Sequence, residues 1–444
     1  MNTLIGKSNN KGLNWARSKK VILFTEIAGQ ARNDGHNRHI HSRYSDESQN
    51  LLQVKETFRT SSGNRMNRKS AIFLLLLCLF FGNVQATVRY VKSGATGTGA
   101  SWANASGNLQ AMINASASGD EVWVAAGTYK PAYTAIGWTP TSHPTTDGVR
   151  DNAFVMKPGV KIYGGFPTGA SDVNNNTLSS RNWVANQTIL SGDIGTAGTA
   201  TDNIYHVVIA AGNLGTALLD GFTITGGYGN TSSSITVNGR SIARNYGAGI
   251  TVHGTMTFSN LTVKANIASS GYGSGIHLNG NSSEGSTFTN IVIAGNTGAQ
   301  DGGGIYVRAM THTMSNVTVA DNKAGYGGGI CIRGGALHLR NSIVWGNTGS
   351  GDNLSVSGGT LSHSYNLIQG ESVTTGLTTI VSNANPLFIN AASGDYRLQA
   401  SSPAIDYGNN ASTAIATDLE GKPRIQGCKI DLGAYESSVA IVPT

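Results

Sequence analysis

The clearest pattern in the chain is a short apolar strand signature that returns about every 25 residues. In each copy an isoleucine and a second aliphatic residue enclose one unrelated residue, as in Ile250-Thr-Val252. Because side chains alternate across a strand, the two aliphatic residues point to one face, which we expect to be buried. The isoleucines that open the four most regular copies lie 26, 29 and 25 residues apart, and they are Ile250, Ile276, Ile305 and Ile330.

Two further marks follow in every copy. A Phe, Met or Leu stands two residues before an asparagine in a second apolar strand, and another asparagine comes six residues later. A unit of this length cannot bury its own apolar face, but units stacked in register enclose a continuous core. We therefore expect vertical ladders of like residues. The asparagine ladders would be Asn260, Asn290, Asn316 and Asn341, and Asn266, Asn296, Asn322 and Asn347.

These features predict an all-β fold, a right-handed parallel β-helix over residues 87–384. Less regular coils, separated by insertions, are expected around residues 119–127, 159–165 and 219–227. Leu109-Gln-Ala-Met-Ile113 has helical spacing, and this N-terminal capping helix would protect the open sheet edge. Residues 385–436 predict an irregular C-terminal cap, followed by a tail at 437–444.

A secretory signal peptide is predicted at residues 66–86. Met66 is followed by a basic stretch, an apolar core from Ala71 to Phe81 and a small-x-Ala cleavage site that ends at Ala86. The alternative is an internal apolar strand. Residues 1–65 lack periodicity and are interpreted as a non-native or disordered extension. We expect the mature chain to be secreted, either extracellular or associated with the outer-membrane surface.

Charge argues against nucleic acid as a partner. The formal net charge is +7, but residues 1–86 hold 13 Lys and Arg against 5 Asp and Glu, which leaves 18 against 19 in the mature chain. No basic stripe remains to neutralise phosphates. The mature chain also lacks a run of about 20 apolar residues, so no transmembrane segment is expected. The mature chain has two cysteines, Cys331 and Cys428, and the sequence does not decide whether they form a disulfide bond.

Several segments resemble a known family of secreted bacterial proteins. The start Tyr90-Val-Lys-Ser-Gly and the later Gly119-Asp-Glu-Val-Trp are similar to pectate-lyase-like β-helix proteins, and the Gly-Gly-Gly-Ile units to polymorphic outer-membrane protein repeats. Two C-terminal motifs resemble the "choice-of-anchor Q" module: Asp418-Leu-Glu-Gly-Lys-Pro-Arg424 and Asp431-Leu-Gly-Ala-Tyr-Glu436. The resemblance implies export and a fold shared by polysaccharide lyases, glycosidases and adhesins, but not one activity.

A column of aromatic residues is the first candidate binding surface. Four residues before each core isoleucine stand Tyr246, Tyr272, Asp301 and Tyr326, which should stack at one turn. Stacked rings can hold the apolar faces of sugars while their hydroxyls offer hydrogen bonds. The alternative is that the tyrosines only seal the turn, because like-residue ladders are what solenoids build.

A second candidate surface consists of outward strand positions. The residue after each core isoleucine is Thr251, His277, Tyr306 or Cys331, and the residue three after it is His253, Asn279, Arg308 or Arg333. Arg308 and Arg333, in neighbouring coils, suit the carboxylates of an acidic glycan. The alternative is a solvated surface of polar side chains.

Neither a metal site nor a cofactor is predicted. The two asparagine ladders are interpreted as structural, since amides can satisfy backbone groups between coils. Asp301, Asp321 and Asp352 share no column, and Asp193, Asp202 and Asp220 fall in coils whose columns the sequence does not define. His253 and His277 occupy different columns, which argues against a histidine metal pair.

The preferred hypothesis is a non-catalytic, adhesin-like module that binds extracellular glycans or other host or cell-surface ligands. A polysaccharide lyase or glycoside hydrolase acting on an acidic polymer is the alternative, with its site in residues 132–240, where insertions can build a cleft wall. A structural surface spacer is the third hypothesis. No catalytic residue is assigned.

Overall fold

The computed structural model describes residues 86–137, 149–280, 285–351, 353–370, 384–412 and 415–438. All of them belong to one compact unit, residues 85–444. The extension and signal peptide expected before residue 86 lie outside the described residues, as does the tail after residue 438.

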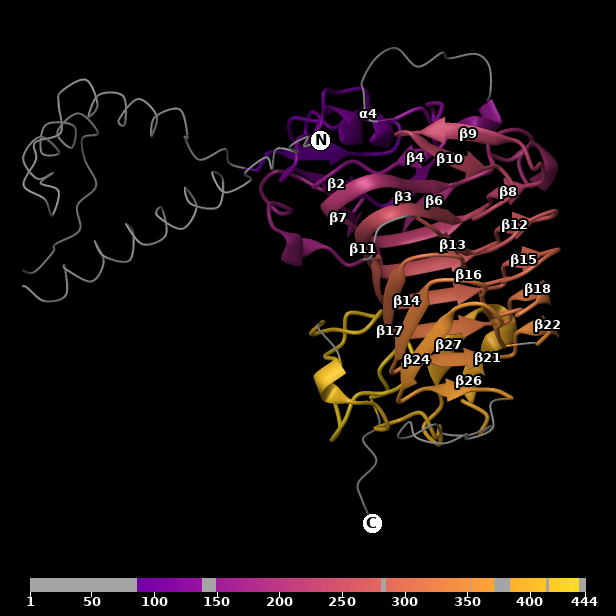
Figure 1. Ribbon diagram of the computed structural model, residues 1–444. Helices are drawn as coiled ribbons and strands as arrows, with labels where there is room; N and C mark the ends of the chain where they lie inside the picture. The colour runs from indigo at the N-terminus through magenta and orange to yellow at the C-terminus, as the bar shows by residue number, and fades with distance from the viewer. Residues whose placement is uncertain are drawn as a thin grey trace, which may run out of the picture. The chain divides into compact units, whose positions relative to one another are not determined.

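The first set of strands carries the isoleucines of the repeat. These strands pair in parallel from coil to coil, and Figure 1 shows them stacked along the molecule. They are β4 (Phe154–Val155), the start of β7 (Val208–Thr225), the start of β11 (Ile250–Lys264), β13 (Ile276–Leu278), β16 (Ile305–Val307), β19 (Ile330–Ile332) and β23 (Leu354–Val356).

Two further sets complete each coil. The second set comprises β1 (Val88–Val91), β2 (Glu121–Ala125), β5 (Lys161–Phe166), the later parts of β7 and β11, β14 (Thr287–Ala294), β17 (Thr311–Ala320), β20 (Ala336–Arg340), β21 (Ile343–Trp345), β24 (Thr360–Ser364) and β25 (Leu367–Ile368). The third comprises β8 (Tyr228–Gly229), β12 (Ile267–Ala268), β15 (Thr297–Gly298), β18 (Lys323–Tyr326) and β22 (Thr348–Ser350). The predicted parallel β-helix is confirmed.

The remaining elements are short strands and turns, of which β3 and β6 also belong to the stacked parallel sheet. Strand β3 (Gly127–Tyr129) pairs with β6 (Thr188–Ser191), and β9 (Ser234–Val237) forms an antiparallel hairpin with β10 (Arg240–Ala243). Short 3-10 turns occupy η1 (Val149–Asp151), η2 (Leu178–Ser180) and η3 (Ala200–Asp202) in the insertions, and η4 (Ala391–Ser393) and η5 (Asn410–Ser412) near the C-terminus.

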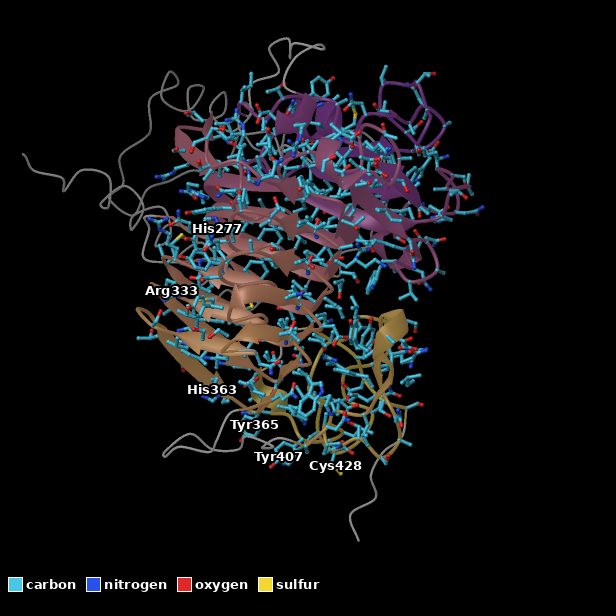
Figure 2. All side chains as sticks on the ribbon, turned by 90° about the vertical axis from the view of Figure 1, so that its right-hand side faces the viewer. His277, Arg333, His363, Tyr365, Tyr407 and Cys428 are labelled. Atoms are coloured by element: carbon cyan, nitrogen blue, oxygen red, sulfur yellow. The ribbon has the colours of Figure 1, made fainter. Side chains whose placement is uncertain are left out.

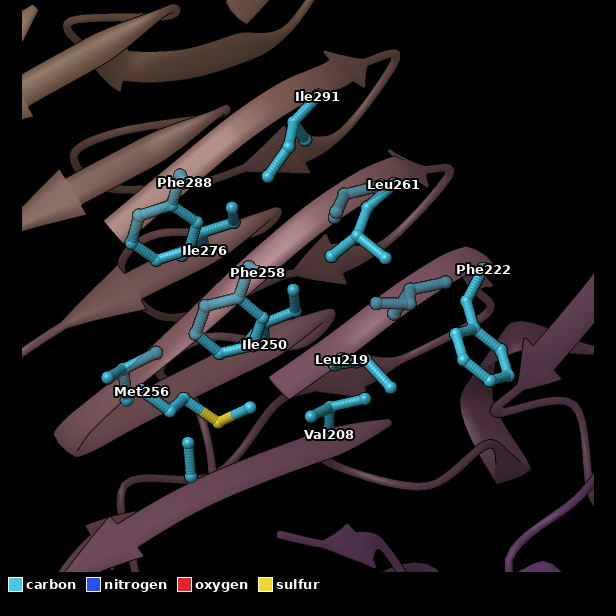
Figure 3. Packing of buried hydrophobic residues seen from close by; sticks show 14 of the residues in the cluster. Val208, Leu219, Phe222, Ile250, Met256, Phe258, Leu261, Ile276, Phe288 and Ile291 are labelled. Atoms are coloured by element: carbon cyan, nitrogen blue, oxygen red, sulfur yellow. The ribbon is translucent and has the colours of Figure 1, made fainter. Parts of the chain in front are cut away.

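Like residues stack in the interior, as the repeat predicts. Ile250 pairs in register with Ile276, Ile276 with Ile305, and Ile305 with Ile330, and all four are fully buried. A second column passes through Phe258 and Phe288, whose rings lie 4.7 Å apart and nearly parallel (Figure 3). Each such side chain removed from water contributes roughly 1.5–3 kcal/mol. The core therefore stabilises the stack, not the single coil.

The expected capping helix is present as α4 (Leu109–Ala115). The side chain of Asn108 caps its first turn, and Ile113 is buried in the main core. The carboxamide of Gln110 exchanges two hydrogen bonds with the backbone of Val155, at 2.8 and 3.1 Å. The helix thus covers apolar surface and also satisfies backbone groups of β4.

The C-terminal segment, residues 385–436, lies along the side of the coils, and Figure 1 shows it in yellow. We call it the C-terminal module; it contains an antiparallel pair, β26 (Phe388–Asn390) and β27 (Asp395–Leu398). Its Ala434 backbone amide donates to the Thr318 hydroxyl at 3.0 Å. Apolar residues join the two surfaces in one cluster, which includes Val292, Ala294 and Ala320 from the strands and Tyr396, Leu419 and Ala434 from the module.

Candidate functional site

The turns before the core isoleucines stack as expected and form a column of Tyr246, Tyr272, Asp301 and Tyr326, here called the turn column. The backbone amides of Gly247 and Gly273 donate across coils to the carbonyls of Tyr272 and Asp301, each at 3.0 Å. The rings of Tyr246 and Tyr272 meet edge to face at 4.7 Å, and Tyr326 is 52% exposed. The column therefore presents partly exposed phenol rings along one edge of the coils.

The neighbouring strand column, Thr251, His277, Tyr306 and Cys331, faces away from the core as expected, but it is not exposed to solvent as a binding surface would be. All four side chains point away from the core but are at most 7% exposed. We call them the covered column. The cause is the glycine turn before each strand. Gly247 has φ +68°, and a Cβ built there would stand 2.8 Å from the Cβ of Thr251 and 2.9 Å from that of His277.

Three buried histidines gather here: His277 of the covered column, and His206 and His253 beside it. Burial lowers the pKa of His206 and His253 to about 4 and the pKa of His277 well below its ordinary value. The Nε2 atom of each ring is buried without a partner among the described residues. The rings of His253 and His277 lie 5.5 Å apart although their columns differ. All three are therefore neutral at neutral pH.

Two arginines flank the turn column, and only one has an acidic partner. In Figure 2, Arg333 and His277 lie along the left-hand side of the coils. Arg333 Nε donates to Asp301 Oδ2 at 2.7 Å, so its charge is compensated within the protein. Arg308 is exposed and hydrogen-bonds Tyr246. Among the described residues no carboxylate forms an ion pair with Arg308, which leaves its charge available to an anion.

A hollow of about 590 Å³ adjoins the turn column, and we call it the arginine pocket. The guanidinium of Arg150 lies 4.1 Å from the ring of Tyr205, and Arg244 pairs with both carboxylate oxygens of Asp151 at 2.6 and 2.8 Å. Arg244 precedes Tyr246 by two residues, so the pocket and the column meet. The other lining residues are Asn230, Thr231 and Ser233.

Among the described residues Arg150 has only neutral hydrogen-bond acceptors. Its Nε donates to the Asn203 carbonyl at 2.6 Å, and its terminal nitrogens donate to Tyr228 O and Asn230 Oδ1 at 2.8 and 3.1 Å. The pocket thus holds two guanidinium groups and one carboxylate. This balance favours an anionic group on a ligand, since a charge-assisted hydrogen bond is stronger than a neutral one.

A second hollow, about 160 Å³, lies between the coils and the C-terminal module, and we call it the module groove. The indole nitrogen of Trp183 donates to the Leu419 carbonyl at 2.7 Å and joins the two walls. Its carboxylates, Asp395 and Glu420, both pair with Arg397. The groove therefore contains aromatic and polar surface, but no pair of unengaged carboxyl groups for acid and base catalysis.

A buried ion pair stands at the edge of this groove. Arg181 contacts Asp220 at 2.6 Å and lies 4.9 Å from the rings of both Tyr163 and Trp183. Desolvation raises the pKa of Asp220, while Arg181 and the amide of Asn260 oppose that rise. The pair holds the 167–187 insertion against the outer face of β7 and β11.

The two asparagine ladders differ in their contacts. In the set Asn266, Asn296, Asn322 and Asn347, here the inner ladder, each Nδ2 donates to the Oδ1 of the next asparagine at 2.9–3.0 Å, and Asn353 extends the series. The set Asn260, Asn290, Asn316 and Asn341, here the outer ladder, has left-handed backbone with φ between 49° and 57°. Its amides bond the C-terminal module at Thr417 and Asn409.

The motifs of the C-terminal module serve its own packing. Arg424 is 1% exposed and donates to the Gly433 carbonyl and to Glu436, at 2.7 and 3.4 Å. Asp418 accepts three backbone amides, including that of Glu436 at 2.8 Å. Burial raises the pKa of Asp431 to about 6 and that of Glu436 to about 9. These side chains hold the module together and are closed to a large ligand.

The described residues contain neither a disulfide bond nor a three-ligand metal cluster of acidic, histidine or cysteine side chains. Cys331 is buried and Cys428 exposed, and both are free thiols; burial raises the pKa of Cys331 to about 11. In the described part of the chain no three His, Cys, Asp or Glu side chains are placed to hold a metal ion. No helix within the described ranges is both long and apolar enough to cross a bilayer.

One family model and several solved structures are similar to this chain, and the family model supports the fold. A family model described as a right-handed β-helix region matches residues 219–368. A pectate lyase, Pel9A, is similar with 13% identity and a TM-score of 0.40, over 79% of this chain and 97% of that one. Pectin methylesterase from carrot has 10% identity and a TM-score of 0.25, over 65% and 73%. No curated protein sequence matches.

A third structural relative, a pectin methyl esterase of rice weevil, has 14% identity and a TM-score of 0.26, over 80% of this chain and 93% of that one. With the matching family model, the stacked parallel coils define this chain as a right-handed parallel β-helix protein.

Sequence reasoning did not find the arginine pocket. Its main residues, Arg150, Tyr205 and Arg244, come from separate insertions and share no repeat position. The docking of the C-terminal module did leave a sequence signal. Val292, Ala294 and Ala320 are apolar at outward strand positions, where a solvated face would be polar.

Proposed function

We propose that this protein works outside the cell as a non-catalytic module that binds an acidic polysaccharide. The ligand would lie along the turn column and enter the arginine pocket. The single observation that carries the proposal is the exposed Arg308 beside half-buried Tyr246, with no carboxylate partner among the described residues. A guanidinium next to phenol rings suits a sugar that carries a carboxylate, since the rings contact its apolar face and the cation its anionic group.

The test is binding of polygalacturonate, measured by calorimetry on the chain from residue 87 onward. Arg308→Ala should weaken binding roughly 10- to 100-fold, because a hydrogen bond to a charged group contributes about 1.5–3 kcal/mol. Arg340→Ala is the matched control, since Arg340 is also exposed but belongs to β20. Equal loss in both variants would show unspecific attraction, and no binding of any acidic glycan would overturn the proposal.

A polysaccharide lyase or glycoside hydrolase is the second candidate, with the module groove as its site, although both carboxylates there pair with Arg397. There Trp183 and Tyr435 lie beside Asp395 and Glu420, between the 167–187 insertion and the C-terminal module. Release of reducing ends or of unsaturated uronate from polygalacturonate, lost in Asp395→Asn, would support catalysis. Binding without either product supports the non-catalytic module. Absence of both binding and turnover supports the third candidate, a structural spacer.

A further inference from the structure

The loop between β6 and β7 contains an unusual set of buried oxygen atoms. The loop closes on itself, because the Ile204 amide donates to the Gly192 carbonyl at 3.1 Å. Three side-chain oxygens within it, the Oδ1 atoms of Asp193, Asp202 and Asn203, are buried and have no hydrogen-bond partner among the described residues. A buried polar atom without a partner costs about 1–3 kcal/mol, and more when it is charged.

The other oxygen of each carboxylate fixes its orientation. Asp193 Oδ2 accepts the Gly198 amide at 3.1 Å, and Asp202 Oδ2 accepts the Thr196 amide at 2.8 Å. Both bonds come from the loop itself, so the backbone holds the two carboxylates while their Oδ1 atoms remain free. The loop therefore positions these oxygens without using them.

Asn203 belongs to the same group of side chains. It is 6% exposed. A Cβ built on Gly226 would stand 3.2 Å from the Asp193 backbone nitrogen and 3.7 Å from Asn203 Nδ2, so both residues lie against Gly226. Asp202 directly precedes Asn203 in the chain. Two carboxylates and a nine-tenths-buried amide thus contribute unpartnered oxygens to one small loop.

Positive charge from the protein does not compensate these carboxylates. Neither Asp193 nor Asp202 forms an ion pair with a described Lys or Arg side chain. Arg150 lies close by, but its Nε donates to the backbone carbonyl of Asn203 at 2.6 Å. The charge of the loop is thus left for a cation from solution.

We propose that Asp193, Asp202 and Asn203 bind a calcium ion. Calcium takes six to eight oxygen ligands at 2.3–2.6 Å in flexible geometry, and carboxylates, amide carbonyls, backbone carbonyls and waters all serve. Zinc prefers nitrogen and sulfur donors, whereas the unpartnered atoms of these three side chains are all oxygens, and magnesium demands a stricter octahedron.

The ion would also act on the arginine pocket. Asn203 supplies the carbonyl that holds Arg150, and Tyr205, whose ring lies against the same guanidinium, follows two residues later. A bound ion fixes the end of the loop and therefore one wall of the pocket. This part rests on the proposed function, whereas ion binding does not.

The direct test is calorimetric titration of the metal-free chain from residue 87 onward with Ca²⁺ and, separately, with Mg²⁺. Sites in extracellular modules have dissociation constants of about 10⁻⁴ to 10⁻³ M, and we expect this range for Ca²⁺ and at least tenfold weaker binding of Mg²⁺. The double variant Asp193→Asn and Asp202→Asn should weaken Ca²⁺ at least tenfold. Each new amide oxygen can still accept the loop amide, so the fold is retained. Asp172→Asn is the matched control and should bind as the parent does, because Asp172 also accepts two backbone amides, those of Trp102 and Ala103 at 2.7 and 3.2 Å.

A second variant guards against a structural explanation. Asn203→Asp adds a third carboxylate and should tighten Ca²⁺ binding several-fold, a gain that loss of folding cannot produce. Its melting temperature should rise more on addition of Ca²⁺ than that of the parent chain. The proposal is overturned if the parent chain shows no saturable Ca²⁺ binding, or if the double variant and Asn203→Asp bind as the parent does.

Discussion

The inner and outer asparagine ladders look alike in sequence and behave differently in the structure. Both recur once per coil, and within each coil the inner asparagine comes six residues after the outer one. In the inner ladder Asn296 Nδ2 donates to Val263 O and to Asn322 Oδ1, both at 2.9 Å, and its Oδ1 accepts from Asn266. In the outer ladder Asn316 makes no side-chain hydrogen bond with any described residue.

The difference comes from what each asparagine is required for. An inner amide is required for its hydrogen bonds, which satisfy backbone groups at a turn. Asn316 of the outer ladder is required for its backbone alone, since its φ is +57°, a conformation that asparagine tolerates better than most residues. Asn290 and Asn341 share that backbone and also bond the C-terminal module. Identical residues in equal spacing can therefore carry different energies. The four predictions below use this contrast, from the largest expected effect to the smallest.

The inner ladder should be the more sensitive. Asn296→Ala leaves the Val263 carbonyl and the Asn266 amide buried without their partner, and we expect a loss of about 3 kcal/mol in the free energy of unfolding. Urea unfolding measures it. Asn316→Ala is the control, and it should lose only about 1–2 kcal/mol, through its left-handed backbone. Equal losses would refute the contrast.

The covered column differs from both ladders because a histidine that titrates, His253, is buried beside it. The pKa of His253 is about 4 in the folded chain and near 6.5 when unfolded, so between these values the unfolded chain binds more protons. Stability should therefore fall as the pH drops from 6.5 to 4, by up to about 3 kcal/mol for this residue.

Unfolding free energies at pH 7 and pH 4 test this prediction. His253→Gln should lose less stability on acidification than the parent chain does. Asn296→Ala serves as the control, because it removes no titrating group and should retain the parent's pH dependence. A His253→Gln variant with the same dependence as the parent would mean that this ring does not govern the acid response.

The outer ladder should matter for the C-terminal module. Asn290 Nδ2 donates to the Thr417 carbonyl at 2.6 Å. Asn290→Gly keeps the left-handed backbone but removes that bond, and should lower the local opening free energy of the module by about 1 kcal/mol. Hydrogen exchange over residues 415–438 reports it, and unchanged protection there would contradict it.

The smallest effect is expected at Asn316. Glycine adopts positive φ without strain, and Asn316→Gly also removes two buried polar atoms that lack partners. The free energy of unfolding should change by less than about 1 kcal/mol in either direction. A loss above about 2 kcal/mol would show that this amide has a partner in solution, such as a buried water.

The regular coils were open to prediction, since isoleucine spacing alone gives the register of β11, β13, β16 and β19. The turn column could be predicted from the same spacing, because its members stand four residues before the core isoleucines. The burial of His277 did not, because it depends on glycine turns that fold back over a strand. The place of the C-terminal module and the arginine pocket depend on insertions outside the repeat, where spacing carries no information on contacts.

One consequence of the inner ladder concerns direction. Every carboxamide donates toward the following coil, from Asn266 to Asn353, so the side-chain dipoles add head to tail along the solenoid. Its final donor, Asn353 Nδ2, meets Gln369 Oε1 at 3.3 Å. Until that acceptor is in place, every partly assembled stack ends in a donor that only the next coil can satisfy. The ladder thus has two unlike ends: a stack without its C-terminal coils ends in an unpaired donor, and a stack without its N-terminal coils ends in an unpaired acceptor.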